Sequence, residues 1–335
     1  MTEKRPYLVD VPVKVNIWTR RECQRKQFDV LKQACPSVMI IQSDGGRNDA
    51  EWKAIKENRK LFDEGIDWEC RVIKVYEEEN RGMYYMIRKI RQVVWENVDR
   101  CIFLEDDYVP AVSFFRFCAE LLEKYKDDQR IEMITGNNVF VEHPAALPND
   151  YFFSEVGWSI WGTATWRDRA QDYDFPLPYE SNQYIKDCLK NGLSAFWYRK
   201  VDGYCSGELV DGHEPGSEYY HAINSVLQHR MSIIPTRNMI CNIGMDGAHA
   251  NVTRSNKKEM SFFNQPTFEV SFPLKPPDYI IDDVAYGKMY AKKLGHPQTQ
   301  AGLFFKRVKY GIRQLLKGQL FATIKRKRSN SLAEK

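Results

Sequence analysis

Apolar and polar residues follow two different rhythms along the first 135 residues of the chain. Short apolar runs predict strands at 13–19, 38–42, 68–75, 101–104 and 131–134. Between these runs, apolar residues return every three or four positions and predict helices at 22–34, 49–64, 82–97 and 113–125. Strands separated by such helices are typical of βαβ units and of a mostly parallel sheet. We therefore expect an α/β fold whose ligands gather beyond the carboxyl ends of the strands.

The pattern changes after residue 135. Residues 136–250 are rich in Trp, Tyr, Gly and Asn, and helical periodicity returns only near 165–173, 184–191 and 218–229, with a short strand at 232–234. Five prolines between residues 251 and 300 indicate an extended strap, with a short helix near 282–294. We expect one domain at 1–250, with halves at 1–135 and 136–250. The strap at 251–300 and a tail at 301–335 follow it.

The near-balance of charge hides an uneven distribution. The 335 residues include 49 Lys and Arg against 45 Asp and Glu, a formal net charge of +4. Residues 303–335 hold ten basic side chains and one acid, so residues 1–302 keep 39 basic and 44 acidic ones, about −5. A mildly acidic body is a poor match for a protein whose whole surface binds nucleic acid. Eight scattered cysteines without a C-x-x-C pair, no signal peptide and no long apolar run favour a reduced, cytoplasmic protein.

The basic tail has the pattern of an amphipathic helix over residues 303–324. Its apolar residues share one side of the helix, and its lysines and arginines lie on the other side or at the border; the apolar set is Phe304, Val308, Ile312, Leu315 and Leu316. A basic run at 325–328 follows. Such a segment is typical of an interfacial helix on anionic lipid, so we expect residues 303–328 to hold the protein on the inner face of the cell membrane. The alternatives are a helix packed on the body and a nucleic-acid arm.

Three consecutive acids, Glu105, Asp106 and Asp107, follow the apolar strand at 101–104. Carboxylates placed together at the end of a buried strand repel one another unless a positive charge lies among them. A divalent cation would supply that charge, and hard oxygen ligands suit Mg²⁺ or Mn²⁺. The alternative is a solvated acidic turn.

The segment around these acids, residues 101–117, resembles the metal-binding region of GT-A nucleotide-sugar glycosyltransferases. It is most similar to N-acetylglucosaminyltransferase I and to a bacterial branch of hemolytic-protein-like nucleotide-diphospho-sugar transferases. Further segments resemble that branch in the same order, and they are 18–22, 43–47, 80–82, 134–138, 161–167, 234–244 and 248–249. Together they span roughly residues 13–250. The resemblance implies a GT-A fold with the nucleotide-binding half at 1–135 and the acceptor half at 136–250.

The resemblance also implies roles for individual residues. The donor nucleotide would meet Thr19, Arg20, Asp44, Gly45, Arg81, Gly82, Glu105 and Asp106. The metal would be held by Asp107, Asp106 and His249, and the sugar or acceptor by Gly136, Asn137, Asn138, Trp158 and Trp161. The general base would be Glu218, with Asp211 and Glu214 as fallbacks. Here the chain has Ser217-Glu218 where the bacterial branch has Trp-Asp.

Each assignment has a plainer alternative. Asp44 and Gly45 could form an ordinary turn, the start of the helix near Gly82 could be ordinary capping, and His249 could be structural. Glu218 could be an acid at a helix start, favoured by the helix dipole. Arg20, also at a helix start, gains nothing from that dipole, which favours a phosphate partner. The tryptophans could belong to the core.

The function expected from these features is a metal-dependent glycosyltransferase. It would move a sugar, with inversion, from a nucleotide-diphosphate donor such as a UDP-sugar to a glycan acceptor, plausibly a lipid-linked oligosaccharide of bacterial surface polysaccharide synthesis. A second hypothesis is a sugar nucleotidyltransferase, although the glycine-rich loop of those enzymes is missing after the first strand. A third is a membrane-associated glycan-binding protein without catalytic activity.

Overall fold

The computed structural model describes residues 4–155, 161–170, 182–193, 227–244, 261–294 and 299–316, together with residues 198, 202 and 225. The chain divides into two compact units. The first comprises residues 1–172 and 228–287, and the second comprises 173–227 and 288–335. Every part of the site described below lies in the first unit.

A twisted sheet forms the centre of the first unit, and in the described residues it has eight strands in the order β3-β2-β1-β4-β8-β6-β9-β7. The strands are β1 (Val9–Asn16), β2 (Pro36–Ser43), β3 (Arg71–Tyr76), β4 (Arg100–Leu104), β6 (Ile131–Thr135), β7 (Tyr151–Ser154), β8 (Thr163–Trp166) and β9 (Met231–Pro235). All except β7 and β8 run in the same direction. The prediction of an α/β fold with a mostly parallel sheet is therefore confirmed.

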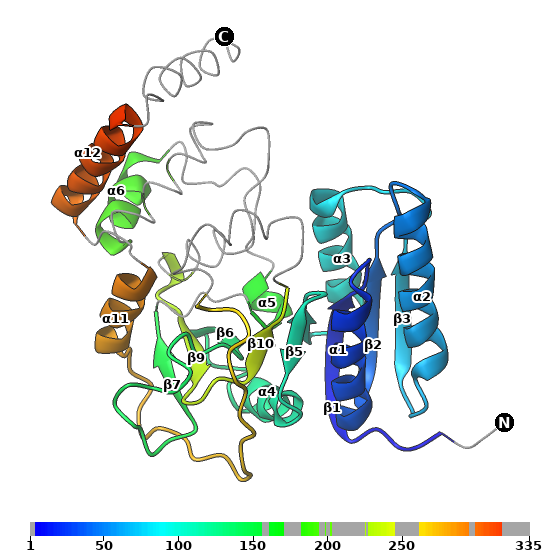
Figure 1. Cartoon of the computed structure of the whole chain (residues 1–335). Coiled ribbons are helices and arrows are strands. Elements are labelled where there is room, and N and C mark those ends of the chain that lie inside the picture. The colour runs from blue at the N-terminus through cyan, green and yellow to red at the C-terminus, as the bar shows by residue number, and fades with distance from the viewer. Residues whose placement is uncertain are drawn as a thin grey trace. The chain divides into compact units, whose positions relative to one another are not determined.

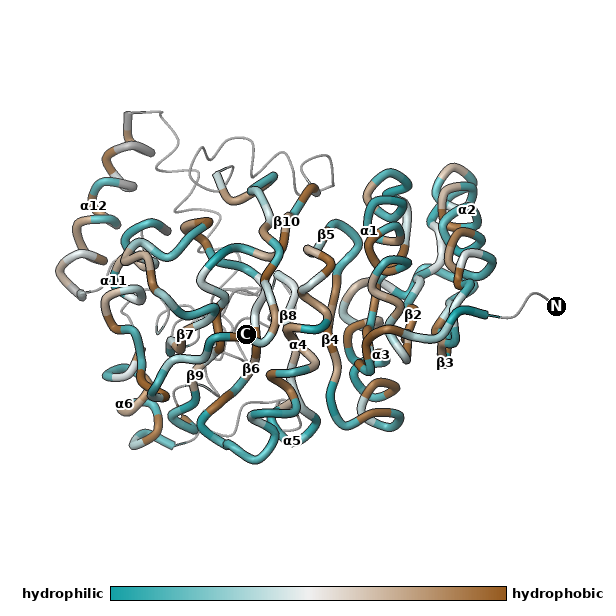
Figure 2. Tube along the Cα trace, turned by 90° about the horizontal axis from the view of Figure 1, so that it is seen from below, coloured by the Kyte–Doolittle hydropathy of each residue, from teal (hydrophilic) through white to brown (hydrophobic). Residues whose placement is uncertain are grey.

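Helices cover both faces of this sheet (Figure 1). They are α1 (Arg21–Ala34), α2 (Asp49–Gly65), α3 (Met83–Asn97) and α4 (Ser113–Lys124). Met39 and Ile41 of β2 pack in the core that α1, α2 and α4 share, whereas Ile40 between them packs with α3 on the opposite face. This division follows from the alternation of side chains along a strand. The mixed teal and brown of α1 and α2 in Figure 2 is that of helices that bury one side.

Sequence periodicity located the helices of the first half well but misplaced one strand. The first strand ends at Asn16, so Thr19 lies in the following loop rather than in the strand predicted at 13–19. The helix predicted at 165–173 is wrong at its start, because Thr163–Trp166 forms β8, between β4 and β6 and antiparallel to both. Only Arg167–Ala170 forms a helix there, α5. The four buried residues of β8 are too few for a period, and strand pairing decides their conformation.

Two further strands make a small second sheet, in which β10 (Ile240–Asn242) pairs antiparallel with β5 (Tyr108–Pro110). The strap between Ser261 and Asp283 has neither helix nor strand, and its Glu269 carboxylate accepts hydrogen bonds from the backbone amides of Val112 and Ser113 at the start of α4. This contact supplies the cap that α4 lacks in its own sequence. Helix α11 (Val284–Leu294) follows where a helix was predicted at 282–294.

The second unit contains α6 (Gln183–Gly192) and α12 (Gln300–Leu316). Both helices were predicted from periodicity, at 184–191 and 303–324, although residues beyond 316 lie outside the described part of the chain. No helix among the described residues is both long and apolar enough to cross a membrane.

Candidate active site

The loops after β1 and β4 meet at the point where the order of strands reverses, because β1 lies between β2 and β4. Such a switch point is where open α/β sheets bind their ligands. Arg20 from the first loop donates a hydrogen bond to Asp107 from the second, and its Nη1 lies 3.3 Å from Oδ1 of Asp106. Their side chains are only 25%, 14% and 21% exposed for Arg20, Asp107 and Asp106. The structure thus brings Arg20 together with two acids of the triplet, Asp106 and Asp107.

Burial governs the ionisation of these carboxyl groups. It raises the pKa of Asp106 to about 7; Arg20 opposes this rise, and the charges of Asp107 and Glu105 add to it. Burial also raises the pKa of Asp107, again against the effect of Arg20. Burial lowers the pKa of Arg20, but the two carboxylates together raise it by more, so the net shift is upward. The single guanidinium of Arg20 therefore compensates the negative charge of Asp106 and Asp107 only in part, and a further cation would stabilise both carboxylates.

Glu105 has hydrogen-bond partners of its own on β1. Its Oε1 accepts a hydrogen bond of 3.2 Å from Nζ of Lys14, and Oε2 accepts one from Nδ2 of Asn16. Lys14 lies in the middle of β1 and is almost fully buried, so its charge requires this partner. Glu105 acts here as a counter-ion to a buried lysine, and its second oxygen is also engaged.

Two glutamines of α1 hold the acidic loop in place. Nε2 of Gln27 donates to the backbone oxygens of Glu105 (2.7 Å) and Tyr108 (2.8 Å), and Nε2 of Gln24 donates to the backbone oxygen of Asp106 (3.3 Å). Both side chains are fully buried. The sequence indicates these two glutamines by their position on the helix, although the spacing of apolar residues alone does not. Gln24 and Gln27 lie on the same side of the helix as the buried Phe28, where polar residues need a specific partner.

Gly244 lies directly against the carboxylate of Asp107. The chain reaches it through β10, and the backbone amide of Ile243 donates to the backbone oxygen of Asp107 (3.0 Å). A Cβ atom on Gly244 would lie 1.9 Å from Oδ2 of Asp107 and 2.6 Å from Nη1 of Arg20. A larger residue at this position would therefore displace the side chains of Asp107 and Arg20. His249, the predicted third metal ligand, lies outside the described residues.

Asp44, at the end of β2, joins two of the predicted nucleotide-binding loops. Its carboxylate accepts hydrogen bonds from the backbone amides of Gly45 (2.8 Å), Arg81 (2.8 Å) and Gly82 (2.9 Å). Nδ2 of Asn80 donates to it as well (3.2 Å). The amides near Gly82 that we expected to approach a diphosphate are thus bonded to Asp44 in this structure. Gly82 has a positive φ of 82°, which a glycine adopts without strain.

The residues predicted to hold the sugar or acceptor are placed differently from one another. Asn137 and Asn138 are buried and bond to Asn238, and a Cβ atom on Gly136 would clash with Ile240. These three pack the interior beneath the site. Trp161 is half-buried, and its ring centroid lies 6.3 Å from that of Tyr108 and 5.3 Å from that of Phe263. Since Tyr108 follows Asp107 directly, this aromatic group borders the acids.

Four other predicted residues, Trp158, Asp211, Glu214 and Glu218, fall outside the described residues. Thr19 is half-buried in the loop after β1. The structure thus brings Arg20, Asp106 and Asp107 together, and it leaves the predicted base untested.

The acids fit a divalent cation by their chemistry. Among the described residues, no three His, Cys, Asp or Glu side chains are grouped so that they could hold a metal ion by themselves. Asp106 and Asp107 nevertheless present hard oxygen ligands on one loop, and Gly244 leaves no side chain over them. Mg²⁺ is commonly held by one or two carboxylates, with water and substrate phosphates completing its shell. The described residues match that incomplete type of site.

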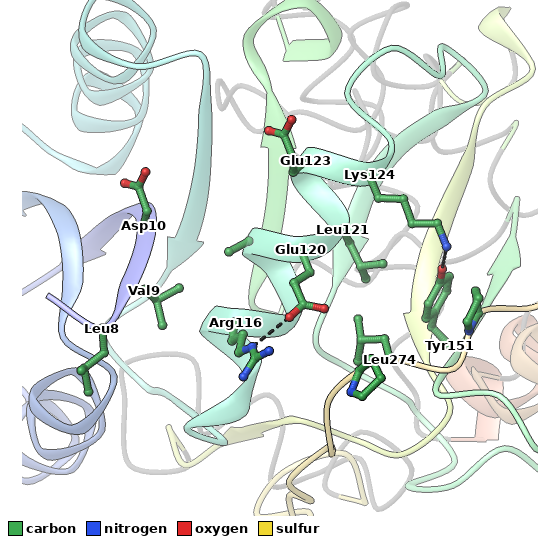
Figure 3. Close-up of a pocket in the computed structure, with 13 residues that line it drawn as sticks. Leu8, Val9, Asp10, Arg116, Glu120, Leu121, Glu123, Lys124, Tyr151 and Leu274 are labelled. Carbon is green, nitrogen blue, oxygen red and sulfur yellow. Dashed lines mark hydrogen bonds and ion pairs between the residues drawn. The ribbon is translucent and has the colours of Figure 1, made fainter.

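A separate hollow of about 700 Å³ lies at the opposite end of β1, where the strand begins (Figure 3). It is lined by the start of β1, by α4 and by the strap. Arg116 pairs with Glu120 across one turn of α4 (2.8 Å), and Nζ of Lys124 donates to the hydroxyl oxygen of Tyr151 (2.9 Å). The lining of this hollow includes none of the predicted site residues.

Comparison with known proteins gives no family for this chain. No protein-family model matches it, and no curated protein does. Solved structures show weak similarity. A mannosyltransferase from Pyrobaculum calidifontis in complex with GDP-Man and Mn²⁺ has a TM-score of 0.36 at 10% identity over 68% of this chain and 72% of that one. UDP-glucose pyrophosphorylase complexed with UDP-glucose has a TM-score of 0.33 at 11% identity, over 69% of this chain and 91% of the other. HddC from Yersinia pseudotuberculosis has a TM-score of 0.26 at 13% identity, over 38% and 57%.

Proposed function

We propose that the protein is a transferase that uses a nucleotide-sugar donor and, more narrowly, a metal-dependent glycosyltransferase with a GT-A fold. One observation carries the proposal: Asp106 and Asp107 share the guanidinium of Arg20 at the switch point between β1 and β4. Partly buried acids with an unmet need for positive charge suit a divalent cation. A lone arginine beside them suits a diphosphate.

Residues of this chain divide the binding of such a donor between them. Asp106 and Asp107 hold Mn²⁺ or Mg²⁺, with His249, five residues after Gly244, as the further ligand that the family resemblance suggests. The cation, when bound, offsets the negative charge that develops on the departing nucleoside diphosphate. Arg20 turns its guanidinium to the diphosphate, and the loops after β1 and β2 receive the nucleoside, which we take to be uridine. Gln24 and Gln27 fix the acids in position.

The transfer itself would proceed with inversion. The acceptor hydroxyl oxygen attacks the anomeric carbon while the bond from that carbon to the diphosphate oxygen breaks. The hydroxyl proton passes to the carboxylate of Glu218, or of Asp211 or Glu214 if Glu218 does not serve. Trp158 and Trp161 offer flat faces to the sugars. We take the acceptor to be a glycan, of the lipid-linked kind.

The test is a panel of UDP- and GDP-sugars measured by thermal shift and calorimetry, each with and without Mn²⁺. We expect at least one donor to bind in a Mn²⁺-dependent manner. Asp107→Asn, which keeps the side chain's shape, should abolish that dependence. Asp29→Asn is the matched control, since Asp29 is an exposed acid on α1 away from the site.

Product analysis separates this function from its rivals. A glycosyltransferase releases a nucleoside diphosphate from the donor, whereas a nucleotidyltransferase consumes a nucleoside triphosphate and releases pyrophosphate. Binding of sugars without any donor turnover would favour a glycan-binding protein. Donor binding that is equal with and without Mn²⁺ in both the wild type and Asp107→Asn would refute the site.

A further inference from the structure

Helix α12 exposes an apolar surface that no described part of the fold covers. Five side chains form it, which we call the apolar arc: Phe304, Phe305, Val308, Ile312 and Leu315, exposed by 60%, 68%, 41%, 54% and 56%. Helix α1 of the first unit behaves in the opposite way. The apolar residues of α1, such as Phe28 and Leu31, are 3% and 0% exposed.

The arc occupies one side of the helix. At about 100° per residue, its five members fall within an arc of roughly 100°. Leu303, the buried residue of this helix, points about 150° away from the centre of the arc. The protein's own packing therefore contacts a different side of α12, and the arc faces outward. A helix that only completed the core would bury the side that carries the apolar arc.

A basic residue borders the arc. Lys309 lies about 40° beyond its edge and is exposed, whereas Lys306, also exposed, lies on the side away from the arc. The sequence from 303 to 335 contains ten basic residues and one acid, including the run at 325–328. An apolar strip flanked by cations is complementary to a surface that has an apolar interior beneath a layer of negative charge. Nucleic acid would use the cations and could stack bases on the phenylalanines, but it would leave the aliphatic side chains of Val308, Ile312 and Leu315 without a partner.

We propose that α12 docks in the plane of an anionic lipid bilayer, with Phe304, Phe305, Val308, Ile312 and Leu315 entering the lipid and the lysines meeting the headgroups. This inference depends on α12 and on the basic residues that follow it in the sequence, and it is independent of the proposed catalytic function. It assigns a surface-lying helix rather than a spanning one.

The test is co-sedimentation of the full chain with vesicles of phosphatidylcholine alone or of an equal mixture with phosphatidylglycerol. We expect the wild type to sediment with the mixed vesicles, to stay in solution with the neutral ones, and to be released by salt. The variant with Phe304→Ser, Ile312→Ser and Leu315→Ser should bind at least about tenfold more weakly. Its substitutions lie on exposed positions, so a thermal melt should show a folded protein.

The matched control removes exposed apolar side chains elsewhere. Tyr279→Ser with Ile281→Ser changes two strap residues that are 78% and 70% exposed, and it should leave vesicle binding unchanged. The proposal is refuted if the wild type does not bind the mixed vesicles at low salt, or if the triple variant binds them as well as the wild type does. It is also refuted if both proteins bind a polyuridine RNA and neither binds vesicles. A dimer that the triple variant loses, without vesicle binding, would assign the arc to a second copy instead.

Discussion

Gly244→Ala is the most direct test of the candidate site, because it adds one methyl group against the proposed metal ligand. The new Cβ atom would lie 1.9 Å from Oδ2 and 2.7 Å from Cγ of Asp107, and 2.6 Å from Nη1 of Arg20. An ordinary contact for such an atom begins at 3.4 Å. The carboxylate must therefore move by about 1.5 Å, the difference between the two distances, and its bond to Arg20 must break or bend.

The expected effect is large on activity and small on stability. A reacting group displaced by about 1 Å can lower turnover on the order of 100-fold. The side chain of Asp107 can leave its rotamer at a cost of roughly 0.5–1.5 kcal/mol, and the Gly→Ala change returns about 0.4–1 kcal/mol by restricting the unfolded chain. We therefore expect Gly244→Ala to unfold near the wild-type temperature. Its Mn²⁺-dependent donor binding and turnover should nevertheless be lost.

Gly311→Ala provides the matched control. A Cβ atom on Gly311 meets nothing within 4 Å, and the residue lies inside α12, where alanine is favoured over glycine by about 0.5–1 kcal/mol. This variant should be slightly more stable and should turn over a soluble donor as the wild type does. Calorimetry with Mn²⁺ and a donor assay compare the two. Wild-type metal dependence and turnover in Gly244→Ala would show that Asp107 does not bind the cation.

Four further variants test the charged residues assigned to the site or to the reaction. Because burial raises the pKa of Asp106 to about 7 from 3.8, its ionisation destabilises the folded protein increasingly as the pH rises through that interval. Melts of the metal-free protein should then show Asp106→Asn gaining stability over the wild type from about pH 4 to about pH 7, with no further gain above that, and a pH-independent difference would contradict this. Glu105→Ala should lower the free energy of unfolding in urea by about 3 kcal/mol, because it leaves the buried Lys14 without its ion pair. Lys14→Met leaves only a half-exposed carboxylate without its partner, so it should lower that free energy far less. Equal losses in the two variants would refute the pairing argument. Glu218→Gln should bind donor normally in calorimetry yet lose transfer, and retained transfer would move the base to another residue.

The first half of the fold could be predicted because its signals are local. Each βα unit carries its own periodicity, so α1, α2 and α3 were located to within a residue or two. The acidic triplet was recognised for a similar reason, since it follows an apolar strand directly. To predict that this triplet lies near Arg20, one further inference is needed, namely that the carboxyl ends of neighbouring parallel strands lie at the same edge of the sheet.

The contacts that complete the site come from distant parts of the chain, and sequence reasoning missed them. Gly244 reaches Asp107 only because β10 pairs with β5, two strands of three residues each that carry no period. Asp44, which was predicted to meet the donor nucleotide, accepts hydrogen bonds from backbone amides near Gly82. The sequence did not reveal these bonds, because a turn that brings amides to a carboxylate looks the same whether the carboxylate is the protein's own or the ligand's.

The charge at the switch point links these observations to the proposed function. Glu105, Asp106 and Asp107 carry three negative charges when ionised, and Lys14 and Arg20 supply two positive ones, which leaves one negative charge in excess. Lys14 is committed to Glu105, so Arg20 alone serves the other two acids. A divalent cation would compete with Arg20 for those carboxylates and would release the guanidinium toward a phosphate. Metal and diphosphate should therefore strengthen each other's binding.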